Sequence, residues 1–341
     1  MKKETFHIQW HITNFCNLRC KHCYQNDFSP KEDLSFLQLK KIIENVFSFL
    51  NEENKNLIID ITGGEVFLHK DWRNLIQFLS NSSIVKELSV ITNGFFLERE
   101  TINFLKNFPK LKIKISTEGI DEKLYEFFRG NGSFLKFMKV IENLQKTNFE
   151  KVLMFTLLET NYSQIEKIFD FLDKYKFDKL IVERFIPLGR GEKIKENIIS
   201  LENWVKTINF LIVKCGLEEN ISSVLPYRAF MVKIINKNYK LYGAPCIIGK
   251  DGIAIMPDGN VFPCRRFPLK IGNLLEKPLK EILENPILKM LTNRKFLKGK
   301  CNRCEISECL GCRALAFAKT GNFLEEDPLC FLRWTNHWVI S

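Results

Sequence analysis

Three cysteines lie within eight residues in the stretch Cys16-Asn17-Leu18-Arg19-Cys20-Lys21-His22-Cys23, directly after a short apolar segment. Thiols this close cannot pair as disulfides and still leave the third one satisfied, so the C-x3-C-x2-C spacing indicates ligands of one metal centre. A 4Fe-4S cluster normally takes four thiolates, and this stretch supplies three, so one iron would stay open to another ligand. A structural zinc site or buried free thiols are the alternative interpretation, although zinc would need a fourth ligand close by.

The motif is similar to the C-x3-C-x-aromatic-C signature of the radical S-adenosylmethionine (radical SAM) superfamily, with His22 at the aromatic position and Tyr24 after the last cysteine. The resemblance implies that the methionyl amino and carboxylate groups of S-adenosylmethionine bind the open iron of a cluster held by Cys16, Cys20 and Cys23. It also implies that the reduced cluster cleaves the sulfonium to a 5'-deoxyadenosyl radical, which abstracts hydrogen from substrate; this chemistry belongs to the cofactor. Either His22 or Tyr24 is expected to pack against adenine.

Composition places the chain among ordinary globular proteins. Its 341 residues are 45% hydrophobic and 27% charged, enough for one large core and an appendage. The amino terminus has no signal-peptide pattern, and no stretch approaches the roughly eighteen apolar residues of a membrane span. We therefore expect a cytoplasmic protein without a membrane partner. In that compartment the 11 cysteines stay reduced and their clusters suggest metal binding.

The net charge of +11 favours an anionic partner, such as an acidic peptide or a polycarboxylate ligand. The surplus lysines are scattered, and no block of basic residues with interleaved aromatics stands out. We therefore expect no nucleic-acid partner.

Short β-branched runs alternate with helical patterns through the first half of the chain, which predicts βα units around a parallel sheet. One helix is expected over residues 35–51, where Ser35 and Gln38 have capping-box spacing and an apolar stripe follows. The fold class is α/β, a partial (β/α)6 TIM-like barrel with a small cysteine-rich C-terminal domain. The six expected strands are Phe6–Thr13, Leu57–Thr62, Glu87–Thr92, Leu111–Ser116, Lys151–Leu158 and Lys179–Phe185.

Function in such barrels gathers at the carboxyl ends of the strands. The second expected strand ends in Thr62-Gly63-Gly64-Glu65, where the glycines allow close approach to a ligand and Glu65 offers a carboxylate. The string resembles the GGE motif of the radical SAM family, which implies that Gly63, Gly64 and Glu65 bind the amino group of the cofactor's methionine.

Polar residues also follow the third and fourth expected strands, each before a glycine. The resemblance assigns Asn93, Ser116 and Glu118 to contacts with the ribose and carboxylate of the cofactor, with turn or helix-capping roles as the alternative. Arg129 opens an Arg-Gly-x-Gly-Ser-Phe stretch found in many relatives. It is expected to make a charge-assisted bond to a carboxylate, unless it is a surface-loop arginine.

Proline and glycine at 187–191 interrupt the βα rhythm, and we place a domain boundary near residue 190. The expected division is 1–190 for the barrel, 191–242 for a helical bridge and 243–341 for the cysteine-rich domain. A helix over Leu201–Lys214 and an apolar segment over 224–235 would form the bridge. Cys215 is interpreted as a packed cysteine.

The last hundred residues carry seven further cysteines. The loops between residues 301 and 312 are C-x2-C-x4-C-x2-C, too short for a zinc ribbon and better suited to iron-sulfur ligation. With the C-x12-G-x4-C string that ends at Cys264, the arrangement resembles the SPASM extension of radical SAM enzymes, which binds auxiliary 4Fe-4S clusters.

The SPASM resemblance implies two auxiliary clusters with different ligand sets. The usual spacing in the extension is C-x2-C-x5-C-x3-C, so this chain is one residue short in each of two loops, and one auxiliary cluster with spare thiols is the alternative. The expected ligand sets are Cys246, Cys264 and Cys312 for one cluster, and Cys301, Cys304, Cys309 and Cys330 for the other. The set of three cysteines leaves one iron of its cluster without an assigned ligand.

SPASM relatives mostly modify ribosomally synthesised peptides by thioether or carbon-carbon crosslinks or by epimerisation, so a peptide is the first expected substrate. Fifteen residues precede Cys16. This leaves no room for a peptide-recognition domain, so a separate protein would present the peptide. A flavodoxin- or ferredoxin-type protein is the expected reductant.

Two other functions are weighed against peptide modification. The segment from Gly311 to Cys330 is similar to relatives that trim tetrapyrrole side chains in alternative haem synthesis, and Arg265-Arg266 suits carboxylates. The same arginine pair disfavours sulfatase maturation, since those relatives carry an aspartate after the equivalent of Cys264. A non-catalytic iron-sulfur electron-transfer protein is the alternative of another class, but an electron carrier needs no open iron.

Overall fold

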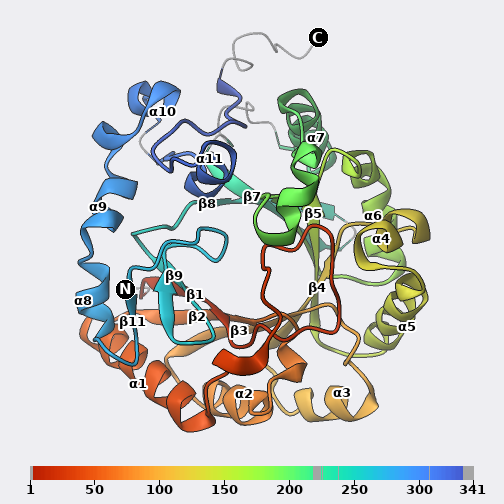
Figure 1. The fold of residues 1–341 in the computed structure, drawn as a ribbon. Coiled ribbons are helices and arrows are strands. Elements are labelled where there is room, and N and C mark those ends of the chain that lie inside the picture. The colour runs from red at the N-terminus through yellow and green to blue at the C-terminus, as the bar shows by residue number, and fades with distance from the viewer. Residues whose placement is uncertain (1–2, 218–223, 225, 237, 307, 333–341) are drawn as a thin grey trace.

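The centre of the molecule is one continuous sheet in the computed structural model, which describes residues 3–217, 224, 226–236, 238–306 and 308–332 (Figure 1). Six consecutive strands in it run parallel. All six predicted strands are present, with ends within two residues of the predicted ones, and the predicted fold class is confirmed. The strands are β1 (Thr5–His11), β2 (Asn56–Thr62), β3 (Val85–Thr92), β4 (Leu111–Thr117), β5 (Glu150–Leu157) and β6 (Lys179–Arg184).

Helices between these strands cover the outside of the curved sheet (Figure 1). The first begins where predicted, because the side-chain oxygen of Gln38 accepts the backbone N–H of Ser35 at 3.0 Å. Its predicted apolar stripe is buried against the sheet. The helices are α1 (Phe36–Glu52), α2 (Trp72–Ser80), α3 (Arg99–Leu105), α4 (Glu122–Arg129), α5 (Ser133–Gln145) and α6 (Ile165–Lys174).

The later part of the chain extends this sheet at both edges. On the β6 side, β7 (Tyr227–Ile235) pairs antiparallel with β6, and β8 (Asn238–Pro245) pairs with β7. On the β1 side, β9 (Gly252–Ile255) pairs parallel with β1, followed by β10 (Asn260–Phe262) and β11 (Gly272–Asn273). Both edges of the parallel sheet are therefore paired, so its backbone groups are not left open there.

The expected helical bridge over 191–242 is only partly helical. A 3-10 segment, η4 (Gly189–Asn197), leads into α7 (Leu201–Lys214), which has the predicted bounds. The apolar segment predicted over 224–235 contains β7, and β8 follows it, so this part of the expected bridge is strand and not helix. Phe230 and Val232 are buried while Lys233 is exposed, a period-2 alternation that suits a strand adding to the β6 edge.

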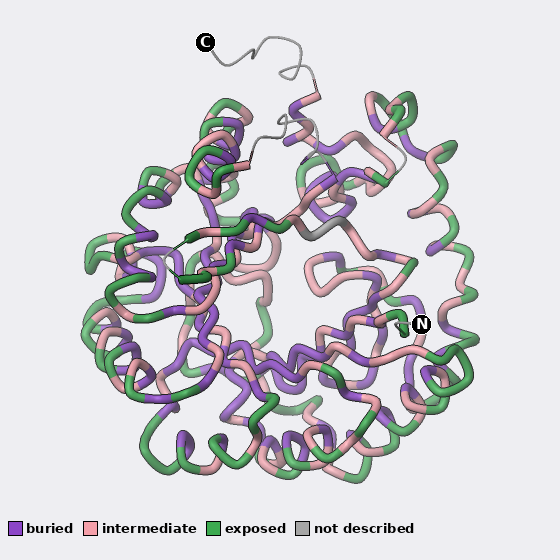
Figure 2. The backbone as a smooth tube through the Cα atoms, turned by 180° about the vertical axis from the view of Figure 1, so that it is seen from behind, coloured by how far each residue is buried: buried purple, intermediate pink, exposed green. Residues whose placement is uncertain are grey.

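Short helices and single turns complete the chain. Burial is concentrated along the strands and the inner faces of the helices, and the exposed positions lie on the outer helix faces (Figure 2). The remaining elements are η1 (Pro30–Glu32), η2 (Val66–Leu68), η3 (Tyr162–Gln164), α8 (Leu279–Leu283), α9 (Pro286–Thr292), η6 (Arg294–Phe296), α10 (Gly299–Arg303) and α11 (Arg313–Thr320).

Candidate active site

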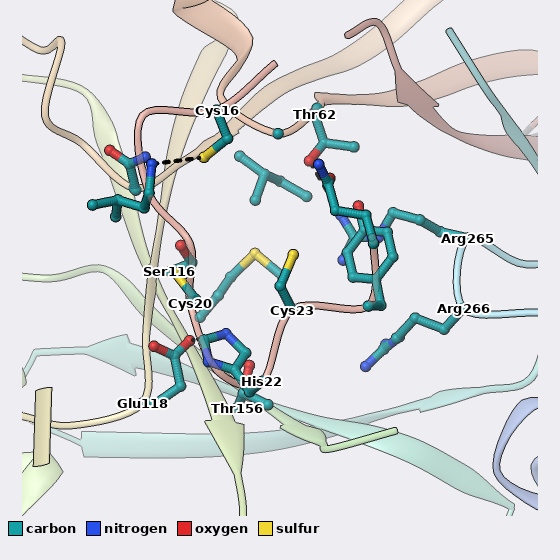
Figure 3. Close-up of a pocket in the computed structure, with 18 of the residues that line it drawn as sticks. Cys16, Cys20, His22, Cys23, Thr62, Ser116, Glu118, Thr156, Arg265 and Arg266 are labelled. Carbon is teal, nitrogen blue, oxygen red and sulfur yellow. Dashed lines mark hydrogen bonds and ion pairs between the residues drawn. The ribbon is translucent and has the colours of Figure 1, made fainter. Parts of the chain in front are cut away.

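The three clustered cysteines lie in the loop after β1 and line one cavity of about 140 Å³ at the carboxyl ends of the strands. Figure 3 shows the thiols of Cys16, Cys20 and Cys23 around this cavity. Burial raises the pKa of each thiol, that of Cys16 to about 11. The site therefore favours neutral thiols unless a cation is bound, and iron supplies such a charge.

The glycines after β2 are needed for contact with this cysteine loop. Gly64 donates its N–H to the Thr13 carbonyl at 2.7 Å, and Glu65 donates to the Phe15 carbonyl at 2.8 Å. A Cβ on Gly64 would lie 2.5 Å from the backbone oxygens of Asn14 and Phe15. Gly63 and Gly64 also line the cavity. Close approach to a ligand was expected of these glycines, and the structure shows that they approach the backbone of the cysteine loop closely.

A second brace comes from the segment after β6, which the sequence suggested only as a domain boundary. Gly191 donates its N–H to the Cys23 carbonyl at 2.9 Å, and Arg190 Nε donates to the Cys20 carbonyl at 3.3 Å. Gly189 has φ +58°, and a Cβ there would lie 2.5 Å from the Tyr24 carbonyl carbon and oxygen. Two glycines flanking an arginine a few residues after the end of β6 were the signal in the sequence.

Glu65 is fully buried and is not among the residues that line the cavity. Its carboxylate accepts the Thr92 hydroxyl at 2.7 Å, the Asn93 N–H at 2.9 Å and the Phe67 N–H at 3.4 Å. Burial raises its pKa to about 7 despite these donors. The Asn93 side chain lines the cavity and donates to the Asn17 side chain at 2.9 Å. Glu65 thus fixes the end of β3 where Asn93 meets the cysteine loop.

Arg129 makes its charge-assisted bonds with Glu118 and is not a surface-loop residue. Its Nε and Nη2 donate to the Glu118 carboxylate at 2.6 and 2.9 Å, and Nη2 also reaches the Ser116 hydroxyl at 3.0 Å. Burial raises the pKa of Glu118, but Arg129 and His22 outweigh it and bring that pKa down to about 2. All four residues line the cavity.

His22 is anchored on this ion pair. Its Nε2 lies 3.0 Å from the Glu118 carboxylate, and its ring meets Phe128 edge-on with centroids 5.7 Å apart. Tyr24 is anchored separately, with its hydroxyl 2.9 Å from His11 Nδ1. Both aromatic residues thus hold the cysteine loop against the barrel while lining the cavity, where packing against adenine stays a prediction.

Arginines from the C-terminal region complete the wall of the cavity, and Figure 3 shows Arg265 and Arg266 beyond Cys23, at the right of the view. The Arg265 guanidinium lies over the Tyr24 ring, 5.0 Å from its centroid, and donates to the Thr62 hydroxyl at 3.2 Å. Arg266 pairs with Glu183 at 3.1 Å. The predicted carboxylate-suited pair therefore faces the cysteine cavity.

The tail cysteines form two spatial groups that coincide with the two expected ligand sets. Cys246, Cys264 and Cys312 line a second cavity of about 250 Å³ inside the barrel. The two cavities share Met154, Glu183, Ile186 and Arg266 as a common wall. The second group, Cys301, Cys304, Cys309 and Cys330, lines a smaller pocket.

Cys215, the remaining cysteine, caps α7 and packs half-buried against the core, away from both groups. Within the described ranges, no three His, Cys, Asp or Glu side chains converge on a point that would hold a single metal ion. In a cubane each thiolate binds a different iron, so ligands need not converge in that way. Each of the three cavities is lined by three or four thiols, the ligand type that iron-sulfur clusters take.

Comparison with known proteins identifies the family. The model of the radical SAM superfamily matches residues 10–172, and the model of the SPASM iron-sulfur cluster-binding domain matches residues 246–305. The chain belongs to the radical SAM superfamily and carries a SPASM domain. It is an enzyme whose cofactors are S-adenosylmethionine, a 4Fe-4S cluster and auxiliary iron-sulfur clusters. No helix among the described residues has the length and apolar character to cross a membrane.

Similar proteins include enzymes of two kinds. The chain is 27% identical to an AdoMet-dependent heme synthase of Methanosarcina barkeri, over 96% of each chain. It is 27% identical to the subtilosin biosynthesis protein AlbA of Bacillus subtilis, over 84% of this chain and 61% of that protein. Streptococcus suis SuiB bound to its precursor peptide SuiA shares the fold, with a TM-score of 0.71 at 17% identity over 97% of this chain and 76% of SuiB.

Proposed function

We propose that Cys16, Cys20 and Cys23 hold the 4Fe-4S cluster and that S-adenosylmethionine binds beside it in the cavity they line. The observation that carries the proposal is that three thiols, one buried and two half-buried, face one cavity whose other walls come from the ends of several neighbouring strands. When bound, the cofactor pair supplies a 5'-deoxyadenosyl radical that abstracts hydrogen from substrate. The further residues assigned to the cofactor site, by contact or by support, are His22, Tyr24, Gly63, Gly64, Glu65, Asn93, Ser116, Glu118 and Arg129.

These residues divide into walls and supports. Asn93 and Ser116 present short polar side chains to the cavity, suited to hydrogen bonds with the ribose or carboxylate of the cofactor. Arg129 and Glu118 neutralise each other and hold His22, so they stabilise the loop without adding net charge. The Glu65 carboxylate accepts the backbone N–H of Asn93 and so sets the position of Asn93.

We assign one auxiliary cluster to Cys246, Cys264 and Cys312 and the other to Cys301, Cys304, Cys309 and Cys330, following their two spatial groups. The first group lines the cavity that shares a wall with the radical site. A cluster there lies where it would accept the electron left on a substrate after hydrogen abstraction. A flavodoxin- or ferredoxin-type protein would supply the initiating electron, and we expect the enzyme to work in the cytoplasm.

The substrate is proposed to bear carboxylates. Arg265 and Arg266 face the radical cavity, and the Nε of Arg265 is buried without a hydrogen-bond partner among the described residues. A guanidinium with a spare donor suits a substrate carboxylate. The overall charge of +11 also favours an anionic substrate.

Two substrate classes meet this description. A ribosomally synthesised peptide, modified by crosslinking or epimerisation, is supported by the similarity to the subtilosin maturation protein, and a separate recognition protein would then present it. A tetrapyrrole whose side-chain carboxylate is the target is supported by two heme synthases whose matches cover 96% and 95% of this chain. The longer match makes the tetrapyrrole the first class to test.

Anaerobic reconstitution with iron, sulfide, dithionite and S-adenosylmethionine tests the cluster assignment. We expect 5'-deoxyadenosine from the wild type and from Cys215→Ala, which removes a thiol outside the cavities, but none from Cys16→Ala, Cys20→Ala or Cys23→Ala. Retained activity in any of the last three would overturn the proposal.

The substrate is tested with the same reconstituted enzyme. An iron porphyrin with propionate side chains should raise 5'-deoxyadenosine formation, because the radical takes one hydrogen from a propionate. The propionate then becomes a vinyl group as carbon dioxide leaves and one electron passes to an acceptor, for which we propose an auxiliary cluster, and the porphyrin loses the corresponding mass. A precursor peptide encoded beside the gene, with its recognition protein, should instead be modified in mass if the peptide is the substrate. Whichever probe is converted identifies the class, and conversion of neither excludes both.

A further inference from the structure

A buried carboxylate, Asp327, joins the two groups of tail cysteines. Its side chain accepts the backbone N–H of Cys312 at 2.8 Å, a contact with the first group. Its own backbone N–H points at Cys301 Sγ at 3.5 Å, and its carbonyl accepts the N–H of Cys330 at 3.1 Å, two contacts with the second group. One residue therefore sets the spacing between the groups.

Two arginines from the barrel sheet hold this carboxylate. Arg184, at the end of β6, lies 3.3 Å from both carboxylate oxygens, and Arg228, on β7, donates to one of them at 3.2 Å. The side chains of Arg184 and Asp327 are 2% and 1% exposed, so water does not screen the contact. Two guanidinium groups against one carboxylate leave a net positive charge beside the cysteines.

Arg228 also reaches a cysteine directly. Its Nη2 donates to Cys309 Sγ at 2.6 Å, and the side chain lines both the cavity of the first group and the pocket of the second. Its Nε is buried and meets no acceptor among the residues that the structure describes. A buried N–H donor without an acceptor lowers the stability of the folded protein. The Arg228 side chain that carries this donor lies between the two groups of cysteines.

We propose that Arg228, oriented by Asp327, is a positioning residue that raises the reduction potential of the auxiliary cluster held by Cys309. N–H···S bonds and positive charge favour the reduced, more negative state of a cluster. A cluster tuned in this way would take one electron from the cluster assigned to Cys246, Cys264 and Cys312 and would pass it to an external acceptor. This inference rests on the proposed function, since it requires both auxiliary clusters.

The test is a redox titration of the reconstituted enzyme followed by electron paramagnetic resonance, with iron content measured on each sample. Arg228→Met removes the charge and the donors, Arg228→Lys keeps the charge and a donor, and Arg303→Met removes an exposed charge from the neighbouring helix α10. We expect Arg228→Met to lower one auxiliary midpoint so that the ratio of reduced to oxidised cluster falls about tenfold, or 59 mV for one electron. Arg228→Lys should recover part of the shift and Arg303→Met should show none.

Each other outcome has a defined meaning. Loss of iron from one auxiliary cluster in Arg228→Met, reversed in Arg228→Lys and absent in Arg303→Met, also supports the proposal, because the positive charge and the N–H donor at position 228 then act on that cluster. Unchanged midpoints with full iron, or equal shifts in Arg228→Met and Arg303→Met, overturn it, and so does iron loss that Arg228→Lys fails to reverse. Failure of the proposed function is distinguishable, since the wild type itself would then show no auxiliary-cluster signals.

Discussion

Replacing Gly189 by alanine tests whether the segment after β6 holds the cysteine loop in place. Gly189 has φ +58°, a backbone region that costs an alanine about 1 kcal/mol. A Cβ there would also lie 2.5 Å from the carbonyl carbon and oxygen of Tyr24. Relieving such an overlap in a packed region costs about 1–3 kcal/mol more, so we expect a total loss of about 3 kcal/mol.

Gly216 is a matched control for this substitution. Its φ is +62°, close to that of Gly189, but no atom of the described residues, its chain neighbours aside, lies within 4 Å of the position of its Cβ. Gly216→Ala should therefore lose only the backbone part, about 1 kcal/mol. Urea denaturation of the iron-free proteins, followed by circular dichroism, gives both free energies of unfolding.

The two variants should also differ in iron binding. Tyr24 follows Cys23, so movement of its carbonyl displaces a cluster ligand, and Gly189→Ala should take up less iron at the first cluster than Gly216→Ala. Equal losses of stability and equal iron content in the two variants would refute the reasoning, because the contact with Tyr24 would then carry no energy.

Three further predictions follow from the site. Glu118→Gln should lower the free energy of unfolding by about 3 kcal/mol, because it leaves Arg129 buried without its charge partner. The pKa of Glu118 in the folded protein is depressed to about 2, so the stability advantage of the wild type over this variant should be full above about pH 4.5 and should fade as the pH falls toward 2. Urea denaturation curves recorded at a series of acid pH values measure this difference. Arg265→Met should raise the substrate KM about tenfold or more with kcat less affected, and Arg265→Lys should restore part of it; an unchanged KM would mean that no carboxylate binds there. Cys246→Ala and Cys301→Ala should each remove one auxiliary cluster, about four irons per chain, and the loss of both clusters from either variant would show that the two groups are not independent.

The strands and the first cysteine motif could be predicted because their signals are local. Each buried parallel strand reads as a short apolar run, and the turn that ends it carries the polar residues of the site. The capping residues of α1 and its stripe are likewise set within one helix. Motifs of this kind depend on neighbours in sequence, so one sequence is enough to place them.

The supports of the cysteine loop depend on contacts between distant segments. Gly189 meets Tyr24 across the barrel, and Glu118 receives both Arg129 and His22. Nothing in the spacing of these residues specifies which carboxylate an arginine will choose. The strand character of β7 was missed for the same reason, since it forms by adding to the edge of β6.

The pairing of β9 with β1 explains how a small cysteine-rich region can take part in radical chemistry. The cysteine loop follows β1, and β9 pairs with β1 in the same sheet. The segment after β9 therefore brings Arg265 against Tyr24 and places Arg266 in the wall that the two cavities share. A substrate at that wall would lie between the proposed radical source and the nearer auxiliary cluster. An electron path needs a fixed separation, and a hydrogen-bonded sheet provides it where a flexible linker would not.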